Sequence, residues 1–404
     1  MKKTNVTVKE LVSYLPSETI DDLAEATGVD YQVKSLRGKD LFLLLLYTHF
    51  KSKDESLRVI ETISKSKGYH AFAGKDEGYN VPHTTLSDRL MNIKVPFMEN
   101  IFNCYTSVLR NLYTPDEYKT CTVKRYDSTF LSLTSKLLHF GMTNGRKPKD
   151  DNAEKHQLKF TIGFDGVVPT SVKMYKDQTD ISDDASFREA ILANSTGPKD
   201  IAVFDRGCKK RTTFKEFWES DVLFVTRINP TTMYEERGSI QFSKNDHEDT
   251  EKLSFKKDLP VYLYEGNGRK CKIPLRLVIY TTKDSGEEIC FLTNIYFMKS
   301  SEIAKIYAMR WDIEVFFKFI KQELGFKHFL SHNENGILVT LYITLIASAM
   351  LLIYKKLNDL KGYKIMKLQF CLELEAEIMK IVVKLCGGRP ELVDNLPPNL
   401  GFGQ

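Results

Sequence analysis

About the first 115 residues are patterned for helices. Leu41–Tyr47 is a short apolar run inside a longer helical pattern that begins near Gly38, and Ser56–Ile63 predicts a further helix. Beyond a stretch rich in Gly, Asp and Asn, Pro82–Leu90 offers a threonine N-cap with Asp88 a turn later. A short helix exposing His, Ser and Arg would suit a DNA-reading helix, and it would equally suit any solvated helix.

The hydrophobic period changes to two beyond about residue 120. Four short β-rich runs follow: Thr122–Thr129, His156–Asp165, Val167–Tyr175 and Ile201–Phe204. Apolar residues occupy alternate positions of the second run, from Leu158 to Phe164, as in a strand with one buried face. Three strands in a row, a helix-sized gap and a fourth strand predict a mixed α/β sheet.

Residues 221–299 contain further strands and no convincing helix. The predicted strands are Val222–Ile228, Pro260–Tyr264, Leu275–Thr282 and Glu288–Phe297. Turns rich in Gly and Lys separate them. We therefore expect an all-β insertion after the α/β unit.

Helical patterning returns in the C-terminal part of the chain. One helix begins at Ser301 and continues past Lys321, and the last covers about residues 364–385 before a Gly-Gly stop. Between them, Ile337–Tyr354 is an uncharged segment at the lower edge of the length that spans a bilayer. Thr and Ser recur four residues apart along this segment and form one polar stripe, which favours a buried core helix over a membrane span.

Composition narrows the class of protein. The chain has 404 residues, of which 42% are hydrophobic and 27% charged, with a formal net charge of +5. These values are typical of a folded, soluble protein, and the charge is compatible with a polyanionic partner without identifying one. Seven scattered cysteines without metal-binding spacing, and the lack of an export signal, favour a reduced cytoplasmic setting and no membrane association.

One polar stripe runs along the otherwise apolar helix that begins at Ser301. At about 100° per residue, an arc of roughly 60° holds four residues: Tyr307, Arg310, Glu314 and Lys321. Lys318 joins the same side. The simpler interpretation is an intrahelical ion-pair row, in which Glu314 pairs with Arg310 and Lys318. Burying three cations beside one acid would leave positive charge unpaired, so we favour phosphate groups as the partners of this stripe.

Two aspartates lie where strands of the α/β unit could present them beside Glu314. Asp127 falls within the first strand, and Asp205 follows an apolar strand just before a Gly turn. A single Asp after a strand is weak evidence, because Asp is common in turns. Phosphodiester chemistry generally uses two divalent metals shared between carboxylates, and the order strand-Asp, strand-end Asp, helix-Glu is that of a ribonuclease H-like metal site.

These motifs resemble the DDE transposases of bacterial insertion sequences. The spacing Tyr-x2-Arg-x3-Glu-x6-Lys is matched from Tyr307 to Lys321, and Asp127-Ser-Thr, Phe-Asp205-Arg-Gly and Leu292-Thr-Asn are also similar to family motifs. The likeness covers about residues 120–350. It implies an α/β fold, in which a ribonuclease H-like catalytic core is interrupted by the β insertion and flanked by helical regions.

The patterning along the chain, taken together with the resemblance, predicts four regions. They are a helical DNA-binding domain at residues 1–117, a catalytic core at 118–220 and 300–355, a β insertion at 221–299 and a helical tail at 356–404.

The resemblance also implies a role for each site residue. Asp127, Asp205 and Glu314 would be catalytic and bind two Mg²⁺ ions, for which Mn²⁺ would substitute. The phosphates of the DNA end would be held by Tyr307, Arg310, Lys318 and Lys321. The expected partners are double-stranded DNA, as terminal inverted repeats and as target, and a second copy of the chain. Relatives can stack a flipped base on a Trp of the β insertion, whereas the two Trp here are Trp218 and Trp311, so that role would fall to an unassigned Tyr or Phe.

A basic cluster follows the second aspartate. Lys209, Lys210 and Arg211 come four to six residues after Asp205, so we favour phosphate contact over a merely solvated loop. The leading hypothesis is a cut-and-paste DNA transposase. A structure-specific nuclease without strand transfer, and a catalytically silent DNA-binding regulator, are the alternatives.

Overall fold

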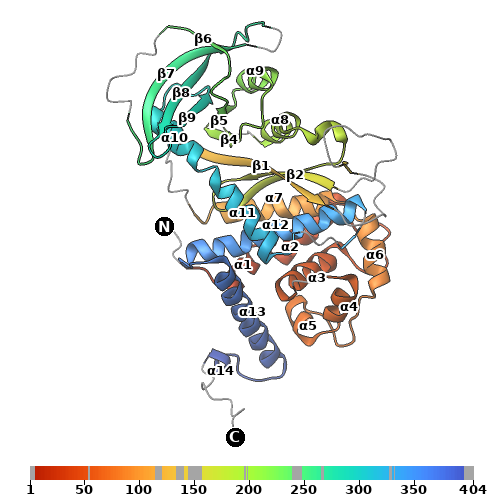
Figure 1. Ribbon diagram of the computed structural model, residues 1–404. Coiled ribbons are helices and arrows are strands. Elements are labelled where there is room, and N and C mark those ends of the chain that lie inside the picture. The colour runs from red at the N-terminus through yellow and green to blue at the C-terminus, as the bar shows by residue number, and fades with distance from the viewer. Residues whose placement is uncertain are drawn as a thin grey trace. The chain divides into compact units, whose positions relative to one another are not determined.

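The structure is a computed structural model, and it describes residues 5–52, 55–113, 121–132, 141–143, 157–194, 197, 199–238, 248–264, 268–326, 330–331 and 333–394 (Figure 1). The chain forms two compact units. One unit comprises residues 1–114 and 319–404, and the other comprises residues 115–318. The expected junction at 117/118 lies outside the described residues.

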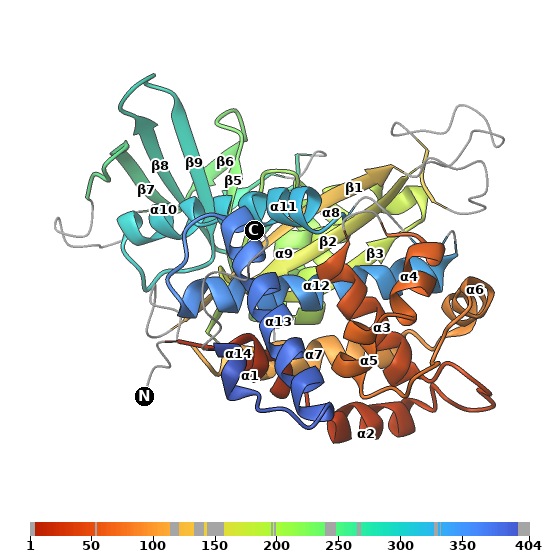
Figure 2. The same ribbon diagram turned by 90° about the horizontal axis from the view of Figure 1, so that it is seen from below.

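The first unit is helical and combines both ends of the chain. Its N-terminal helices are α1 (Val8–Ser13), α2 (Ser17–Thr27), α3 (Gly38–Lys51), α4 (Leu57–Ser64), α5 (Lys67–Ala73), α6 (His83–Asn92) and α7 (Pro96–Arg110). Its C-terminal helices are α12 (Glu334–Leu357), α13 (Tyr363–Leu385) and α14 (Glu391–Asp394). Figure 2 shows α12 and α13 beside the N-terminal helices, in agreement with the contacts of α12 with α3, α6 and α7.

Helix α12 is the core of this unit. Among the described helices it alone is long and apolar enough to cross a bilayer, but 94% of its most apolar stretch is buried inside the protein. Its hydroxyl stripe needs no water, because Thr340 and Thr344 each donate to the carbonyl four residues back, and Ser348 donates to Leu345. The predicted core helix is confirmed.

Helix α6 differs in detail from the sequence prediction. The N-cap is Pro82, not a threonine, and the first N–H of the helix, that of His83, donates to Glu61 (3.0 Å). Arg89 is buried, and its guanidinium donates to the carbonyl oxygens of Leu36 and Val29. The helical spacing suggested that Arg89 is exposed, but its hydrogen bonds to residues far away in the sequence keep it buried.

The second unit is built on one nine-stranded sheet. Its strands are β1 (Thr122–Ser132), β2 (Gln157–Phe164), β3 (Pro169–Tyr175), β4 (Asp200–Phe204), β5 (Leu223–Ile228), β6 (Tyr234–Glu236), β7 (Leu253–Leu263), β8 (Leu275–Thr282) and β9 (Glu288–Thr293). The helices of this unit are η1 (Gln178–Ile181), α8 (Asp183–Asn194), α9 (Arg211–Glu219), α10 (Ser300–Ala308) and α11 (Trp311–Glu323), the last of which continues into the first unit.

The strand order is β3-β2-β1-β4-β5-β9-β8-β7-β6. Strands β3, β2 and β1 pair antiparallel, β1, β4 and β5 pair parallel, and β5 pairs antiparallel with β9. The fold is therefore mixed α/β, as expected. The strands of residues 221–299 do not form a sheet of their own, however, because β5 and β9 join them edge to edge to the first four strands.

Alternation along the strands gives the sheet two apolar faces. Val123, Ile201 and Val203 pack in one core with residues of α10, whereas Tyr126, Ala202 and Phe204 pack in another with residues of α8 and α9. Because side chains two apart share a face, Asp127 follows the side of Val123, and Asp205 follows the side of Ile201 and Val203. Both aspartates therefore belong to the face that α10 covers.

The helix predicted from Ser301 past Lys321 is two helices. Helix α10 ends at Ala308 and α11 begins at Trp311. At the junction, the N–H of Arg310 donates to Tyr307 and that of Asp312 to Met309, which are bonds across three residues instead of four. The single-helix geometry assumed from the sequence is therefore wrong at the position where the signature residues lie.

Candidate catalytic site

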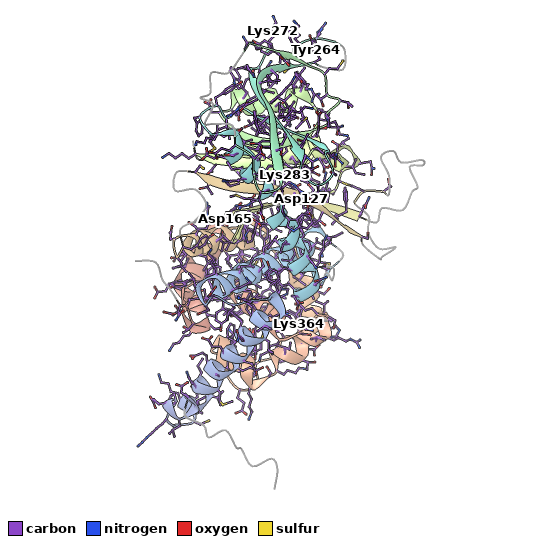
Figure 3. The ribbon with its side chains drawn as sticks, turned by 60° about the vertical axis from the view of Figure 1, so that its left-hand side comes forward. Asp127, Asp165, Tyr264, Lys272, Lys283 and Lys364 are labelled. Carbon is purple, nitrogen blue, oxygen red and sulfur yellow. The ribbon has the colours of Figure 1, made fainter. Side chains whose placement is uncertain are left out.

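Asp127 lies on β1, which pairs antiparallel with β2 and parallel with β4 (Figure 3). Its side chain is partly buried, and its Oδ1 accepts a hydrogen bond from the N–H of Ser128 (2.8 Å). Burial, with smaller contributions from Glu314 and Asp183, raises the pKa of Asp127 to about 6 against the lowering effects of Ser128 and Arg310. Asp127 thus lies within the electrostatic influence of two other acids and one cation.

Asp205 lies on the turn that follows β4. Its Oδ1 accepts from the N–H of Arg206 (2.7 Å) and from the hydroxyl of Tyr307 (3.2 Å). Burial and the nearby Asp205 raise the pKa of Tyr307 to about 12, so its hydroxyl remains a donor at neutral pH. The first residue of the signature is therefore joined directly to the second aspartate.

Arg310 and Glu314 form an ion pair in which Nη2 and Oε1 are 2.6 Å apart. Burial lowers the pKa of Arg310, but Tyr307, Glu314 and Asp205 outweigh burial and raise it above its ordinary value. Arg310 therefore pairs directly with Glu314, and its charge also acts electrostatically on Asp127 and Asp205.

The remaining signature cations are less enclosed than the sequence suggested. Arg310 has a side chain only 15% exposed, but Lys318 is exposed and Lys321 is partly exposed on α11. The prediction that three cations are buried beside one acid is therefore wrong, since α11 turns Lys318 to the surface. The ion pair expected in the simpler interpretation exists between Glu314 and Arg310.

The donors are of the kind that a divalent metal prefers. Asp127, Asp205 and Glu314 offer only carboxylate oxygens, which suit Mg²⁺ and Mn²⁺. Over the described ranges, however, no three Asp, Glu, His or Cys side chains lie close enough to hold a metal ion together. In this structure the positive charge among the acids comes from Arg310.

The three residues of the basic cluster after Asp205 differ in their exposure and contacts. Lys209 and Lys210 are exposed, while Arg211 donates to the carbonyl oxygens of Tyr264 (3.2 Å) and Lys209 (2.9 Å). Tyr264 lies toward the opposite end of the sheet from Asp127 (Figure 3). A hollow of about 570 Å³ is lined by Lys209, Lys210, Arg211, Thr212, Thr231, Met233 and Tyr264.

Sequence reasoning missed the two acids that begin α8. Asp184 accepts from the N–H groups of both Lys209 and Lys210 (2.6 Å each), and Asp183 pairs with the fully buried Lys159 (2.8 Å). A Cβ on Gly207 would come within 2.3 Å of Asp183, so the turn after Asp205 packs directly on this carboxylate. No local spacing signals these contacts, which join segments some 25 residues apart.

Two further motif residues have structural roles. Thr293 donates to the carbonyl of Phe224 (2.6 Å), and Asn294 donates to Val222 (2.8 Å) while accepting from the N–H of Phe224 (3.0 Å). The Leu-Thr-Asn motif therefore joins β9 to β5. Trp218 and Trp311 are 44% and 62% exposed, respectively, so neither is a core residue.

Comparison with known proteins identifies the class and then the family. The transposase DDE domain family matches residues 123–350, more than half of the chain. The chain belongs to this family. It is a DDE transposase of the kind encoded by bacterial insertion sequences, as the sequence motifs predicted.

Three bacterial relatives are named as transposases. The y4zB protein of Sinorhizobium fredii is 31% identical over 179 residues, 43% of this chain and 49% of the relative. A protein named for element IS4SA of Synechocystis sp. is 28% identical over 55% of this chain and 56% of its own, and one named for IS5377 of Geobacillus stearothermophilus is 22% identical over 86% and 84%. The match thus spans about half the length of the first two relatives.

A solved structure of the piggyBac transposase synaptic complex with hairpin DNA aligns with 99% of this chain and 87% of its own, at 12% identity and a TM-score of 0.48.

Proposed function

We propose that this transposase binds the terminal inverted repeats of its element and catalyses divalent-metal-dependent cleavage and strand transfer of double-stranded DNA. The observation that carries the proposal is that Arg310 pairs with Glu314 and acts electrostatically on Asp127 and Asp205, while Tyr307 is hydrogen bonded to Asp205. The strand order β3-β2-β1-β4-β5 supports a ribonuclease H-like core for this chemistry. We further propose that two copies pair the two element ends.

The metal site would use the three acids. Asp127, Asp205 and Glu314 would hold two Mg²⁺ ions, or Mn²⁺ in their place, and such ions polarise a scissile phosphate and promote ionisation of the attacking hydroxyl. For the three acids to hold metal ions together, the ion pair between Glu314 and Arg310 would have to break. The forked guanidinium would then be available to two oxygens of a DNA phosphate.

The other polar residues would hold the DNA. Tyr307 would keep Asp205 oriented through its 3.2 Å hydrogen bond. Lys318 and Lys321 on α11 would bind the backbone of the element end as point charges. Lys209 and Lys210 would bind phosphates at the loop after Asp205, with Arg211 fixing that loop through Tyr264 and contributing its charge.

A cleavage assay tests the proposal. Purified protein with Mg²⁺ or Mn²⁺ is incubated with a plasmid carrying its own gene and the flanking DNA, and both cut and rejoined products are mapped. Asp127→Asn, Asp205→Asn and Glu314→Gln should each slow cleavage by at least about a hundredfold. Asp284→Asn, which changes an exposed turn residue of the same unit, is the matched control and should cleave as the parent.

The products distinguish the alternatives. Strand-transfer products joined to new sites support a transposase, whereas cutting without joining supports a nuclease. Repeat binding without cleavage under either metal supports a silent regulator. Cleavage by Asp205→Asn at the parent rate would refute the assigned site.

A further inference from the structure

Arg125 is a fully buried arginine that no part of the proposed chemistry uses. Its side chain is 0% exposed. Nη1 donates to the carbonyl oxygens of Val123 (2.8 Å) and Asp165 (2.7 Å), the latter labelled near Asp127 in Figure 3. A buried guanidinium is costly unless its donors are matched, so its partners show what its burial stabilises.

Two further contacts of Arg125 lie at the junction of α10 and α11. Nε donates to the carbonyl of Met309 (3.3 Å), and Nη2 donates to Oδ2 of Asp312 (3.0 Å). Met309 and Asp312 bracket Arg310, and Glu314 follows half a turn later. One side chain of β1 thus holds both ends of the segment that carries the signature arginine.

Arg125 lies on β1 two residues before Asp127. Side chains two apart on a strand share a face, so Arg125 and Asp127 point to the same side of the sheet. The strand that carries the first aspartate is thereby tied, across 184 residues of sequence, to the junction that aims Arg310 and Glu314. Gly166 provides the space, because a Cβ there would lie 2.8 Å from Nη1 of Arg125.

We propose that Arg125 is a positioning residue of the catalytic site, which sets the α10–α11 junction through Met309 and Asp312 and so fixes Arg310 and Glu314 relative to Asp127. The guanidinium of Arg125 reaches the carbonyl of Met309 and the carboxylate of Asp312 from separate nitrogens held in one plane, whereas the ammonium of a lysine would supply a single point charge without that fixed geometry. The inference rests on the proposed function for its effect on rate, but its structural part stands independently.

The first test removes the charge of Asp312, whose side chain is 43% exposed, while keeping its shape. Asp312→Asn should lower the single-turnover cleavage rate by on the order of 10- to 100-fold, with DNA affinity changed less than about twofold. Glu216→Gln is the matched control, because Glu216 of α9 is an acid of similar exposure (37%) that pairs with Arg188 of α8. It should cleave as the parent.

A second readout is independent of catalysis. Trp311 lies at the junction, and Trp218→Phe leaves it as the only tryptophan of the chain. In that background, Asp312→Asn should make the time-resolved fluorescence anisotropy of Trp311 decay faster, and Arg125→Lys should do the same while circular dichroism remains that of a folded protein. Asp312→Asn combined with Arg125→Lys should add little to either single change.

The outcomes separate the two proposals. If the parent cleaves and Asp312→Asn cleaves equally fast, the positioning role is wrong. If the parent cleaves no DNA, the proposed function fails, and the anisotropy alone decides the structural claim: unchanged decay in Asp312→Asn overturns it, and faster decay supports it. If Arg125→Lys does not fold, Asp312→Asn still gives the answer.

Discussion

Asp127 illustrates how one side chain can oppose the stability of the fold that positions it. Burial raises its pKa to about 6, because the charged form loses hydration and faces Glu314 and Asp183. The folded protein therefore holds this proton more tightly than the unfolded chain does. The stability contribution of the neutral form is complete below pH about 4 and is lost as the pH rises through about 6.

Asp127→Asn should accordingly stabilise the metal-free protein at neutral pH. We expect a gain of about 1–2 kcal/mol at pH 7.5, discounted for partial exposure, and roughly half of it at pH 5. Urea unfolding in the presence of EDTA at the two pH values measures the gain. Asp284→Asn should give no pH-dependent difference, and an equal gain for Asp127→Asn at both pH values would contradict the electrostatic explanation.

At the scale of elements, the start of α8 determines the shape of the loop that carries Asp205. Asp184 accepts two backbone N–H groups of that loop, and Asp183 fills the space beside Gly207. The loop is thus held from a helix that precedes it by some 20 residues in the chain. Its exposed lysines are presented on a backbone that is itself hydrogen bonded.

Asp184→Ala should loosen this loop while the sheet remains folded. Removing the carboxylate leaves two N–H groups unsatisfied, which costs about 1–3 kcal/mol of unfolding free energy. Hydrogen exchange at the amides of Lys209 and Lys210 should accelerate, while the amides of β4 keep their protection. Asp284→Ala serves as the comparison, and unchanged exchange at Lys209 and Lys210 would show that Asp184 does not hold the loop.

The sheet shows the same dependence on distant partners. Residues 221–299 have the alternation of an all-β insertion, yet β5 pairs with β4 and β9 pairs with β5. Periodicity identifies a strand but not its neighbour, because the hydrogen bonds that join strands are formed by the backbone, which every residue shares. Thr293 and Asn294 add the side-chain ties at this join.

At the scale of the whole molecule, the helical unit cannot be assigned to one continuous segment. Helix α12 packs on α3, α6 and α7, and Tyr342 contacts Phe102 with ring centroids 5.8 Å apart. Helix α13 buries Phe370 against Phe50 and Tyr354. A domain limited to residues 1–117, as predicted from the sequence, would leave these apolar surfaces uncovered.

A fragment of residues 5–113 should therefore not fold by itself. Each large side chain that loses its cover forfeits about 1.5–3 kcal/mol, and several do so at once on α3 and α7. Thermal unfolding followed by circular dichroism should show no cooperative transition for the fragment, in contrast to the full chain. A cooperative transition would show that α12 is dispensable for the N-terminal helices.

The sequence by itself determined the family and located many of the elements. Period-two and helical spacing located the strands and α12, and the fixed spacing from Tyr307 to Glu314, with Asp127 and Asp205, identified the family. These features depend on neighbours within a few residues along the chain, where local geometry sets which side chains share a face.

Only the tertiary structure decided how these elements act together. Four features have no local signal in the sequence. They are the break between α10 and α11, the exposure of Lys318, the hydrogen bonds of Asp184 to the loop after Asp205, and the burial of Arg125. Each depends on contacts between segments far apart in the sequence, where burial and hydrogen-bond satisfaction override intrinsic propensity. The sequence motifs suggested the three acids of the proposed site, whereas the contacts of Arg125 and Asp184 could be found only from the packing.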